Sequence, residues 1–277
     1  MWRFRSAAKT SVPSVLWSYD KFAPQSSEPH VVVLNYHDID DQGRSPFTVG
    51  TRDFASQVRS IHRAGFTFLD GSAFLRLMAG QAPDSGTKWV LLTFDDGYTS
   101  FETHAAPVLR EHGASAIIFI HTDRGSVRIN AGTPVLDWDA IGRLHAGGFE
   151  IGNHSHTHRS FRTLSDEELD DELDRSETML RERIGRSPRF FAYPGGEFDE
   201  RTTAKLIRHG YAAAFGGRQG RTAPSSNPMN RERICIRRET STGQLFFALR
   251  GALDRYEALR RGPKAGGPFP PERADAR

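Results

Sequence analysis

The sequence predicts an α/β protein, a distorted barrel of about seven parallel strands with helices on the outside. Short apolar runs alternate with helical patterns along the middle of the chain, and this order favours a parallel sheet covered by helices. The length of 277 residues is large for an ordinary domain but normal for a single barrel. Polar or turn-forming residues follow four of the apolar runs, where a barrel carries its chemistry.

Seven segments have the character of buried strands. The two longest, HVVVLNY at 30–36 and KWVLLTF at 88–94, are almost continuously apolar, as strands covered on both faces are. The other five are shorter and lie at 115–120, 149–152, 189–193, 211–215 and 231–238. Their count and spacing predict a barrel rather than an open sheet.

Between the strands, apolar residues recur at helical spacing. The clearest helix is 164–185, where Ser165 and Glu168 form a capping-box pattern and Gly185 marks the end. Further helices are predicted at 51–65, 100–112, 138–148, 201–210 and 241–260.

One domain is predicted over residues 30–260, because no linker-like stretch interrupts them. Residues 1–29 lack clear periodicity and are interpreted as an N-terminal leader or decoration. Residues 261–277 are rich in Pro, Gly and charge, so they cannot bury enough apolar surface to order themselves. A disordered tail is expected there.

Composition narrows the class of protein. A hydrophobic content of 37% and a charged content of 26% are typical of a soluble globular protein. The net charge of +3 comes from scattered basic residues, so no nucleic-acid partner is predicted. No run reaches the roughly 18 apolar residues of a membrane span. The single cysteine, Cys235, excludes an internal disulfide and is interpreted as a small buried hydrophobe.

Location and assembly are weakly constrained. The first residues lack the continuous apolar run of a secretory signal, so the chain as written is expected in the cytoplasm. Action at the cell envelope stays open, and the oligomeric state is not predicted.

The ends of four predicted strands carry the candidate functional residues. Because the carboxyl ends of parallel strands meet at one mouth of a barrel, these residues are expected to lie together. In chain order they are His37 with Asp38, then Asp95 with Asp96, then Asn153 with His154, His156 and His158, and finally Pro194, Gly195 and Gly196.

Two of the clustered histidines have metal-ligand spacing. His154 and His158 are four positions apart, so one helical turn would bring both imidazoles to the same side. Such a pair suits a divalent metal, although the same spacing also occurs on solvated helix faces. His156 lies between them and is expected to point elsewhere, in a structural or solvent-facing role.

The neighbouring Asp95 and Asp96 admit two interpretations. Asp and Gly favour turns, so the sequence DDG after a strand is typical of a simple turn. Alternatively, one aspartate joins the two histidines as a metal ligand and the other acts as a base toward water. A bound metal would also relieve the repulsion between the two carboxylates.

The joint occurrence of several motifs resembles the polysaccharide deacetylase family, also called the NodB-homology domain or carbohydrate esterase family 4. It resembles most the branch that removes acetyl groups from poly-N-acetylglucosamine, in which the acid histidine comes early in a circularly permuted motif order. The resemblance covers roughly residues 30–240 and implies a distorted barrel of the NodB type. The motifs are LNYHDI, F-x-x-Q-V, TFDDGY, WDAI, GFEIGNHSHTH and FFAYPGG.

Carried over by position, the resemblance implies a role for five residues. Asp95 would be the catalytic base and His37 the acid that protonates the leaving amine. Asp96, His154 and His158 would hold a divalent metal. Zn²⁺ is the first expectation for this ligand set, and Co²⁺ or Ni²⁺ would fit the same ligands.

The resemblance also points to substrate residues. FFAYPGG, with Tyr193 and Gly195, occupies the place of a motif whose backbone N–H stabilises the oxyanion. An aromatic residue usually stands where this chain has Gly195, but a backbone donor survives a side-chain change. Trp138 resembles a tryptophan that lines the site, although a core tryptophan would be equally ordinary.

A second departure concerns the arginine that pairs with the base in many relatives. The matching position here is Ala192. Arg237 or Arg238, at the end of the last predicted strand, is expected to reach the site instead, the alternative being a solvated arginine.

Together these implications predict a metal-dependent hydrolase that removes N-acetyl groups from a polysaccharide or oligosaccharide containing N-acetylglucosamine. An N-acetylated glycan is therefore the expected partner. Two alternatives on the same scaffold are an O-acetyl esterase and a cyclic-amide hydrolase. A catalytically silent glycan-binding module is the alternative from another class, and it would need a broken ligand set.

Overall fold

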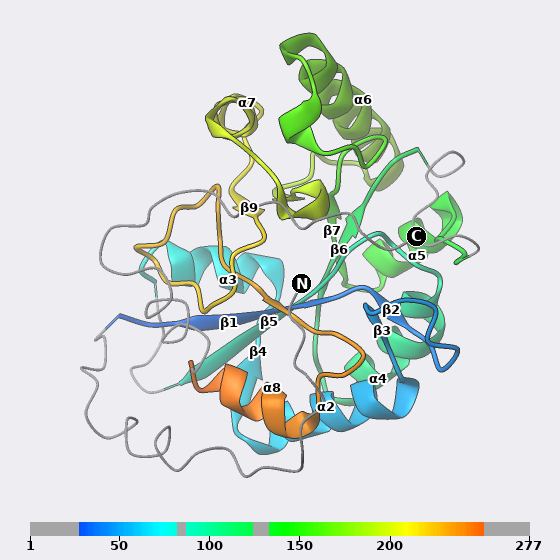
Figure 1. Ribbon diagram of the computed structural model, residues 1–277, viewed down its shortest axis with the longest axis vertical. Helices are drawn as coiled ribbons and strands as arrows, with labels where there is room; N and C mark the ends of the chain where they lie inside the picture. Colours follow the sequence, from blue (N-terminus) through cyan, green and yellow to red (C-terminus); the bar gives the residue numbers. More distant parts are fainter. Residues whose placement is uncertain (1–27, 82–86, 124–132, 252–277) are drawn as a thin grey trace.

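A computed structural model describes residues 28–81, 87–123 and 133–251 (Figure 1). Seven parallel strands form one curled sheet, and β4 (Phe66–Phe68) pairs with β5 beside that path. The seven strands, in spatial order, are β10 (Ile234–Cys235), β1 (Val31–Tyr36), β5 (Lys88–Phe94), β6 (Ile117–Ile120), β7 (Glu150–Asn153), β8 (Phe190–Ala192) and β9 (Ala213–Phe215).

The segment 228–236 brings the two edges of the sheet together. On one side, the Arg231 N–H donates to the Ala214 carbonyl at 2.8 Å, and Arg231 forms a parallel bridge with Phe215 of β9. A few residues later, Ile234 pairs with Leu34 of β1. This closing segment curls the seven strands into the distorted barrel that the sequence predicts.

Side chains alternate between the inside and the outside of the barrel along each strand. On β1, Val31 and Val33 join an interior cluster to which β5, β6, β8, β9 and α3 (Gly71–Met78) also contribute. Leu34 and Tyr36 face outward into the larger core beneath the helices. Gly152 of β7 faces inward, where a Cβ atom would lie 2.5 Å from the ring of Phe119.

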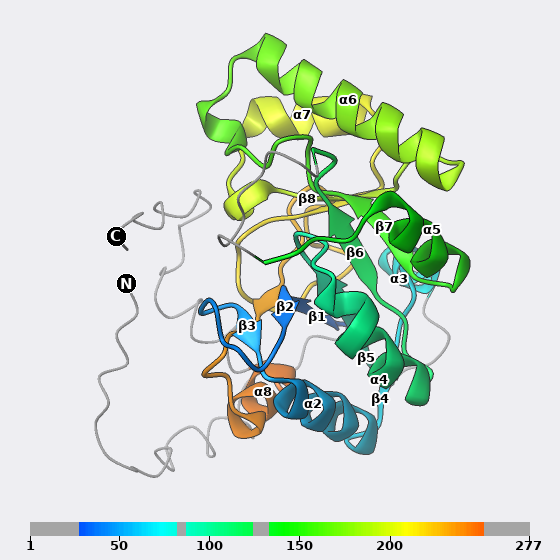
Figure 2. The ribbon, with the colours of Figure 1, turned by 90° about the vertical axis from the view of Figure 1, so that its right-hand side faces the viewer.

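Helices cover the outside of the sheet. Figure 2 shows α6 (Asp166–Ile184) and α7 (Glu200–Arg208) side by side beyond β8, with α2 (Thr51–Arg63) and α8 (Thr242–Leu249) at the opposite end. As the sequence predicts, α6 begins at the capping box of Ser165 and Glu168 and ends at the left-handed Gly185. The remaining helical elements are η1 (Phe101–Ala105), α4 (Ala106–Glu111), α5 (Trp138–Ala146), η2 (Phe161–Thr163) and η3 (Pro194–Gly196).

Some elements differ from the sequence prediction. The helix expected at 100–112 begins with a π-helical turn, η1, before α4. The strand expected at 231–238 is reduced to β10, because the chain crosses from β9 to β1 over this stretch. Three short strands and one helix were not predicted, namely β2 (Asp38–Ile39), β3 (Thr48–Val49), β4 and α3.

Several expectations fall wholly or partly outside the described residues. They are nearly all of the N-terminal leader, the tail from residue 261, and the part of the 241–260 helix beyond residue 251. Within the described ranges, no helix combines the length and the apolar character needed to cross a bilayer.

Candidate active site

A sharp turn after β5 separates the two neighbouring aspartates. The Asp95 N–H donates to the Tyr36 carbonyl at 2.9 Å, so Asp95 continues the pairing with β1. Asp96 and Gly97 then adopt left-handed backbone angles, with φ of 72° and 63°. A non-glycine residue holds this conformation only where its surroundings fix it. The turn directs the two carboxylates toward different partners.

Asp96 faces the two histidines with metal-ligand spacing. Its Oδ1 atom lies 3.4 Å from His154 Nε2 and 3.3 Å from His158 Nε2. One ligand atom from each of these three residues lies within 4.8 Å of the others. Asp96 and His154 are buried, and His158 is partly exposed. The structure therefore places Asp96, rather than Asp95, beside the histidine pair.

The two imidazoles meet through a loop, and the expectation of a helical turn is wrong. Residues 154–158, here called the histidine loop, follow β7 directly and are not helical. Ser155 and His158 have φ of 72° and 60°, which turns the backbone twice within four residues. His156 points away, as expected, and its Nδ1 atom is hydrogen-bonded to the Thr122 hydroxyl at 2.8 Å.

The chemistry of this donor set fits a divalent metal. His154 Nδ1 donates to the Ala192 carbonyl at 2.6 Å, which leaves the Nε2 lone pair of the neutral ring facing the Asp96 carboxylate. A cation between two such electron-rich atoms stabilises their contact, and a divalent metal could supply it. Tetrahedral ligands 2.0–2.1 Å from zinc lie about 3.3–3.4 Å apart, close to the Asp96–histidine distances given above. Three protein donors also leave a position for water or substrate, as catalytic sites do.

Asp95 has a different set of partners. Arg233 donates to both carboxylate oxygens, with Nη1–Oδ1 at 2.7 Å and Nη2–Oδ2 at 2.8 Å. Asn35 Nδ2 donates to Oδ2 at 3.1 Å, and His37 Nε2 lies 4.0 Å from the same oxygen. Asp95 and Arg233 are both buried. A bidentate, buried pair of this kind fixes the direction of the carboxylate.

The arginine beside Asp95 is therefore Arg233, not Arg237 or Arg238. The backbone of Arg233 lies just before β10, farther from the mouth of the barrel than Asp95. Its guanidinium lies 5.7 Å from the ring centroid of Phe119 and 5.6 Å from that of Phe215. Strand-end position predicted the wrong arginine because it ignored the length of this side chain.

The other two arginines lie elsewhere. The Arg237 guanidinium lies 4.7 Å from the centroid of the Phe47 ring, and Arg238 donates to the Gly43 carbonyl.

Burial and charge act in opposite directions on the ionisable groups. Burial alone would raise the pKa of Asp95, but the positive charge of Arg233 and the nearby His154 and His37 lower it below its ordinary value. Burial likewise opposes ionisation of Asp96, and hydrogen bonds from His154 and His158 hold its pKa well below the ordinary value.

The histidines show the same competition. Burial lowers the pKa of His37, against the opposing charges of Asp96 and Asp95. For His154 burial lowers the pKa, but the hydrogen bond with Asp96 and the negative charges of Asp95 and Asp96 together outweigh it and raise the pKa. The pKa of each histidine thus reflects a balance between burial, which lowers it, and the neighbouring carboxylates, which raise it.

His37 stands at the mouth of the barrel, directly after β1. Its ring packs on Phe47 with 4.7 Å between centroids, and its side chain remains 16% exposed. It is close to Asp95 and open on one side, which are the conditions for proton exchange with a bound molecule.

The predicted substrate residues differ in their placement. Gly195 is exposed at the end of β8, in a left-handed conformation with φ of 63°. Tyr193 is buried and turned away, with its hydroxyl donating to the Met229 carbonyl at 2.9 Å. Trp138 packs against the outer core, with the Arg183 guanidinium 5.5 Å from its ring centroid. Of these three residues, Gly195 is exposed, Trp138 is partly exposed and Tyr193 is buried.

Three residues at or behind the site were not predicted from sequence. Asn35 bonds Asp95, His121 is buried after β6 with its ring 6.2 Å from that of His158, and Glu172 of α6 contacts the histidine loop. Strand alternation offered one usable signal, because Asn35 shares the inward face with Val31 and Val33.

Removing the charge of Arg233 should strongly destabilise the protein. We expect Arg233→Gln to lower the free energy of unfolding by about 3–5 kcal/mol, because it leaves a buried carboxylate without its ion partner. Urea denaturation measures the difference. Arg186→Gln is the control, since Arg186 forms a more exposed pair with Glu150 at 3.0 Å, worth about 0–1 kcal/mol. Equal losses in the two variants would contradict the prediction.

Comparisons with known proteins find one family to which this chain is similar. The polysaccharide deacetylase family model matches residues 82–214. That span contains Asp95, Asp96 and the histidine loop, whereas His37 and Arg233 lie outside it. The chain is similar in structure to IcaB from Ammonifex degensii, with a TM-score of 0.72 and 26% sequence identity. The match covers 81% of this chain and 98% of the IcaB chain.

Curated relatives match over part of their length. YxkH of Bacillus subtilis (strain 168) is 27% identical over 180 residues, 65% of this chain and 61% of that protein. A chitooligosaccharide deacetylase of Bradyrhizobium sp. (strain ANU 289) is 31% identical over 132 residues, 47% of this chain and 56% of that protein. The chain thus spans less than two thirds of either relative. The family match over residues 82–214, the shared barrel and the Asp/His/His cluster together make this chain similar to the polysaccharide deacetylase family.

Proposed function

We propose that the protein is a metal-dependent hydrolase that removes N-acetyl groups from a polysaccharide or oligosaccharide containing N-acetylglucosamine. One observation carries the proposal: an Asp/His/His cluster with metal-ligand geometry lies next to a second aspartate that has its own arginine and a nearby histidine. The name of the Bradyrhizobium relative, a chitooligosaccharide deacetylase, supports the substrate class.

The metal would be held by Asp96, His154 and His158, with Zn²⁺ as the first expectation and Co²⁺ or Ni²⁺ fitting the same donors. When bound, such an ion supplies Lewis-acid chemistry, because it polarises a carbonyl and lowers the pKa of water. The hydrogen bond from His154 Nδ1 to the Ala192 carbonyl fixes the tautomer whose Nε2 faces the site.

The other residues of the site would move protons and orient the substrate. The Asp95 carboxylate, kept ionised and fixed in direction by Arg233, accepts a proton from the attacking water. His37 Nε2 donates a proton to the leaving nitrogen, so that the C–N bond breaks to give an amine and acetate. Gly195 is an exposed residue at the end of β8, and its backbone N–H would bind the oxyanion of the tetrahedral intermediate.

A substrate panel tests the proposal. Acetate release should be found with N-acetylglucosamine oligomers, should fall to background after treatment with a chelator, and should return when Zn²⁺ is added back. Metal dependence follows from the donor set, since Asp95 alone is a weak means of activating water. Treatment with chelator followed by Mg²⁺ is the control, because Mg²⁺ prefers oxygen ligands.

The same panel separates the alternatives. Preferential release from acetylated xylan would indicate an O-acetyl esterase, and ring opening of cyclic amides would indicate an amidase on the same scaffold. Glycan binding without any acetate release would support a silent binding module and contradict the proposed hydrolysis.

A further inference from the structure

The histidine loop uses all five of its backbone N–H groups, and they bond to three kinds of partner. Two of these groups bond within the loop region: Ser155 N–H to Asn153 Oδ1 and His158 N–H to Ser155 Oγ, each at 2.9 Å. The His154 N–H continues the sheet by donating to the Ile120 carbonyl, also at 2.9 Å. The remaining two N–H groups, of His156 and Thr157, leave the loop and converge on a single oxygen of Glu172, each at 2.8 Å.

Glu172 is dedicated to this loop. It is only 4% exposed, and its second carboxylate oxygen accepts a hydrogen bond from the Thr157 hydroxyl. Among the described residues, all of the hydrogen bonds given to this carboxylate come from the loop. A buried carboxylate that bonds backbone N–H groups holds a local backbone conformation more strongly than a neutral acceptor does.

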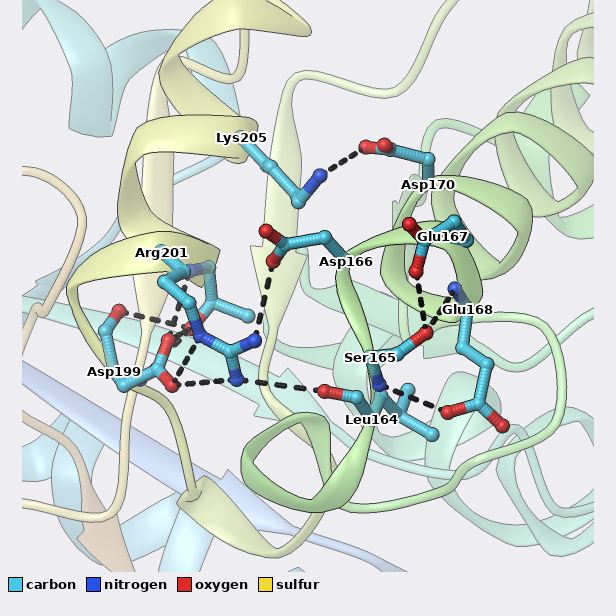
Figure 3. A network of polar contacts seen from close by, with 10 residues as sticks. Leu164, Ser165, Asp166, Glu167, Glu168, Asp170, Asp199, Arg201 and Lys205 are labelled. Atoms are coloured by element: carbon cyan, nitrogen blue, oxygen red, sulfur yellow. Dashed lines mark hydrogen bonds and ion pairs between the residues drawn. The ribbon is translucent and has the colours of Figure 1, made fainter.

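The helix that carries Glu172 is itself fixed in place. Figure 3 shows α6 tied to α7 by two ion pairs, Lys205 to Asp170 at 2.5 Å and Arg201 to Asp166 at 3.1 Å. One turn after Glu172, the Ser176 hydroxyl of the same helix accepts a hydrogen bond from Asn153 Nδ2 at 2.7 Å, at the root of the loop. The helix thus contacts both the root and the middle of the loop.

We propose that Glu172 is a positioning residue for the metal centre, a role that rests on the proposed function. Ser155 and His158 must both hold left-handed backbone angles for the two imidazoles to meet Asp96. Glu172 bonds the two residues that lie between them, and so holds the loop in that shape before the metal binds. Without Glu172, the loop would have to become ordered when the metal binds, and this entropic cost would lower the affinity for the metal.

Zinc affinity of the substrate-free protein tests this role. We expect Glu172→Ala to raise the Kd for Zn²⁺ by about 10–100-fold, the range found for residues that support a metal ligand from behind. Competition with a chromophoric chelator measures the Kd, and thermal unfolding of the metal-free protein measures stability separately. Glu172→Gln should recover most of the affinity, because its amide oxygen can accept from both N–H groups while its amide nitrogen donates to Thr157.

Glu150→Ala is the matched control. Glu150 is a largely buried carboxylate at the opposite end of β7, where it pairs with Arg186 and Arg189 at 3.0 Å each. Its loss should lower stability and leave the Zn²⁺ affinity unchanged. If Glu172→Ala does not fold, Glu172→Asp replaces it, since the shorter chain withdraws the carboxylate from the loop.

The outcomes separate this role from the proposed function. Wild-type affinity in Glu172→Ala or Glu172→Asp, or an equal loss of affinity in Glu150→Ala, overturns the positioning role alone. A wild-type protein that binds no Zn²⁺, Co²⁺ or Ni²⁺ overturns the metal site and this inference together. Zn²⁺ binding that depends on Glu172, in a protein that releases no acetate, supports the positioning role and counts against the proposed hydrolysis.

Discussion

Asp95→Asn should reduce kcat for acetate release by about 10²–10⁴-fold, the usual contribution of a general base, and should leave one metal ion bound per chain. The amide has nearly the shape of the carboxylate and still offers one oxygen to Arg233, but it cannot accept a proton at neutral pH. Asp96, His154 and His158 are untouched, so the metal content should not change. Steady-state kinetics and elemental analysis of the same preparation measure the two quantities.

Asp70→Asn is the control for this variant. Asp70 caps α3 by accepting a hydrogen bond from the Ala73 N–H at 2.7 Å, and asparagine caps a helix about as well as aspartate does. Its activity should therefore match the wild type. Near-normal turnover in Asp95→Asn would show that another group activates the water.

His154→Ala should abolish stable metal binding, and with it activity. The substitution removes one of three protein donors and also the hydrogen bond that holds the ring against Ala192. Two remaining donors on a partly exposed site bind a divalent ion much more weakly than three. Metal content after gel filtration should fall from about one ion per chain to near zero, and added Zn²⁺ should restore little activity at concentrations that saturate the wild type.

His156→Ala is a close control, because it lies in the same loop and differs only in the direction of its ring. Its Nδ1 atom bonds the Thr122 hydroxyl and does not face Asp96. The variant should keep its metal and most of its activity. Loss of the metal from His156→Ala but not from His154→Ala would contradict the assignment of ligands.

The sequence predicts the barrel and its four functional strand ends because both depend on local patterns. Apolar runs such as KWVLLTF identify buried strands without knowledge of their neighbours. Parallel strands then bring their carboxyl ends to one mouth, so that Asp96, His154 and His158 meet although about sixty residues separate them. The family resemblance added the expected division of roles between Asp95 and Asp96. The structure shows only their positions, with Asp96 beside the two histidines and Asp95 beside Arg233.

The remaining features depend on long side chains and on contacts that no local pattern encodes. Arg233 reaches Asp95 from a lower level of the barrel, which strand-end position alone does not indicate. The left-handed residues Ser155 and His158 flank His156, whose N–H bonds Glu172 of another element. The spacing of two histidines does not encode such a contact, and it favours a helical turn instead. Short elements such as β2, β3 and β10 contain too few residues for a periodic signal.

The closing segment 228–236 links the folding of the barrel to the completion of the site around Asp95. It joins β9 to β1 across some two hundred residues of sequence, and it also carries Arg233. Contacts between such distant parts of a chain are the costly ones to form during folding. Asp95 therefore acquires its counter-charge only when the last strand docks. Without this segment the Asp95 carboxylate would lack the bidentate contact with Arg233, although Asp96, His154 and His158 lie outside the segment. The proposed hydrolysis would therefore depend on the docking of the closing segment as well as on the metal ligands.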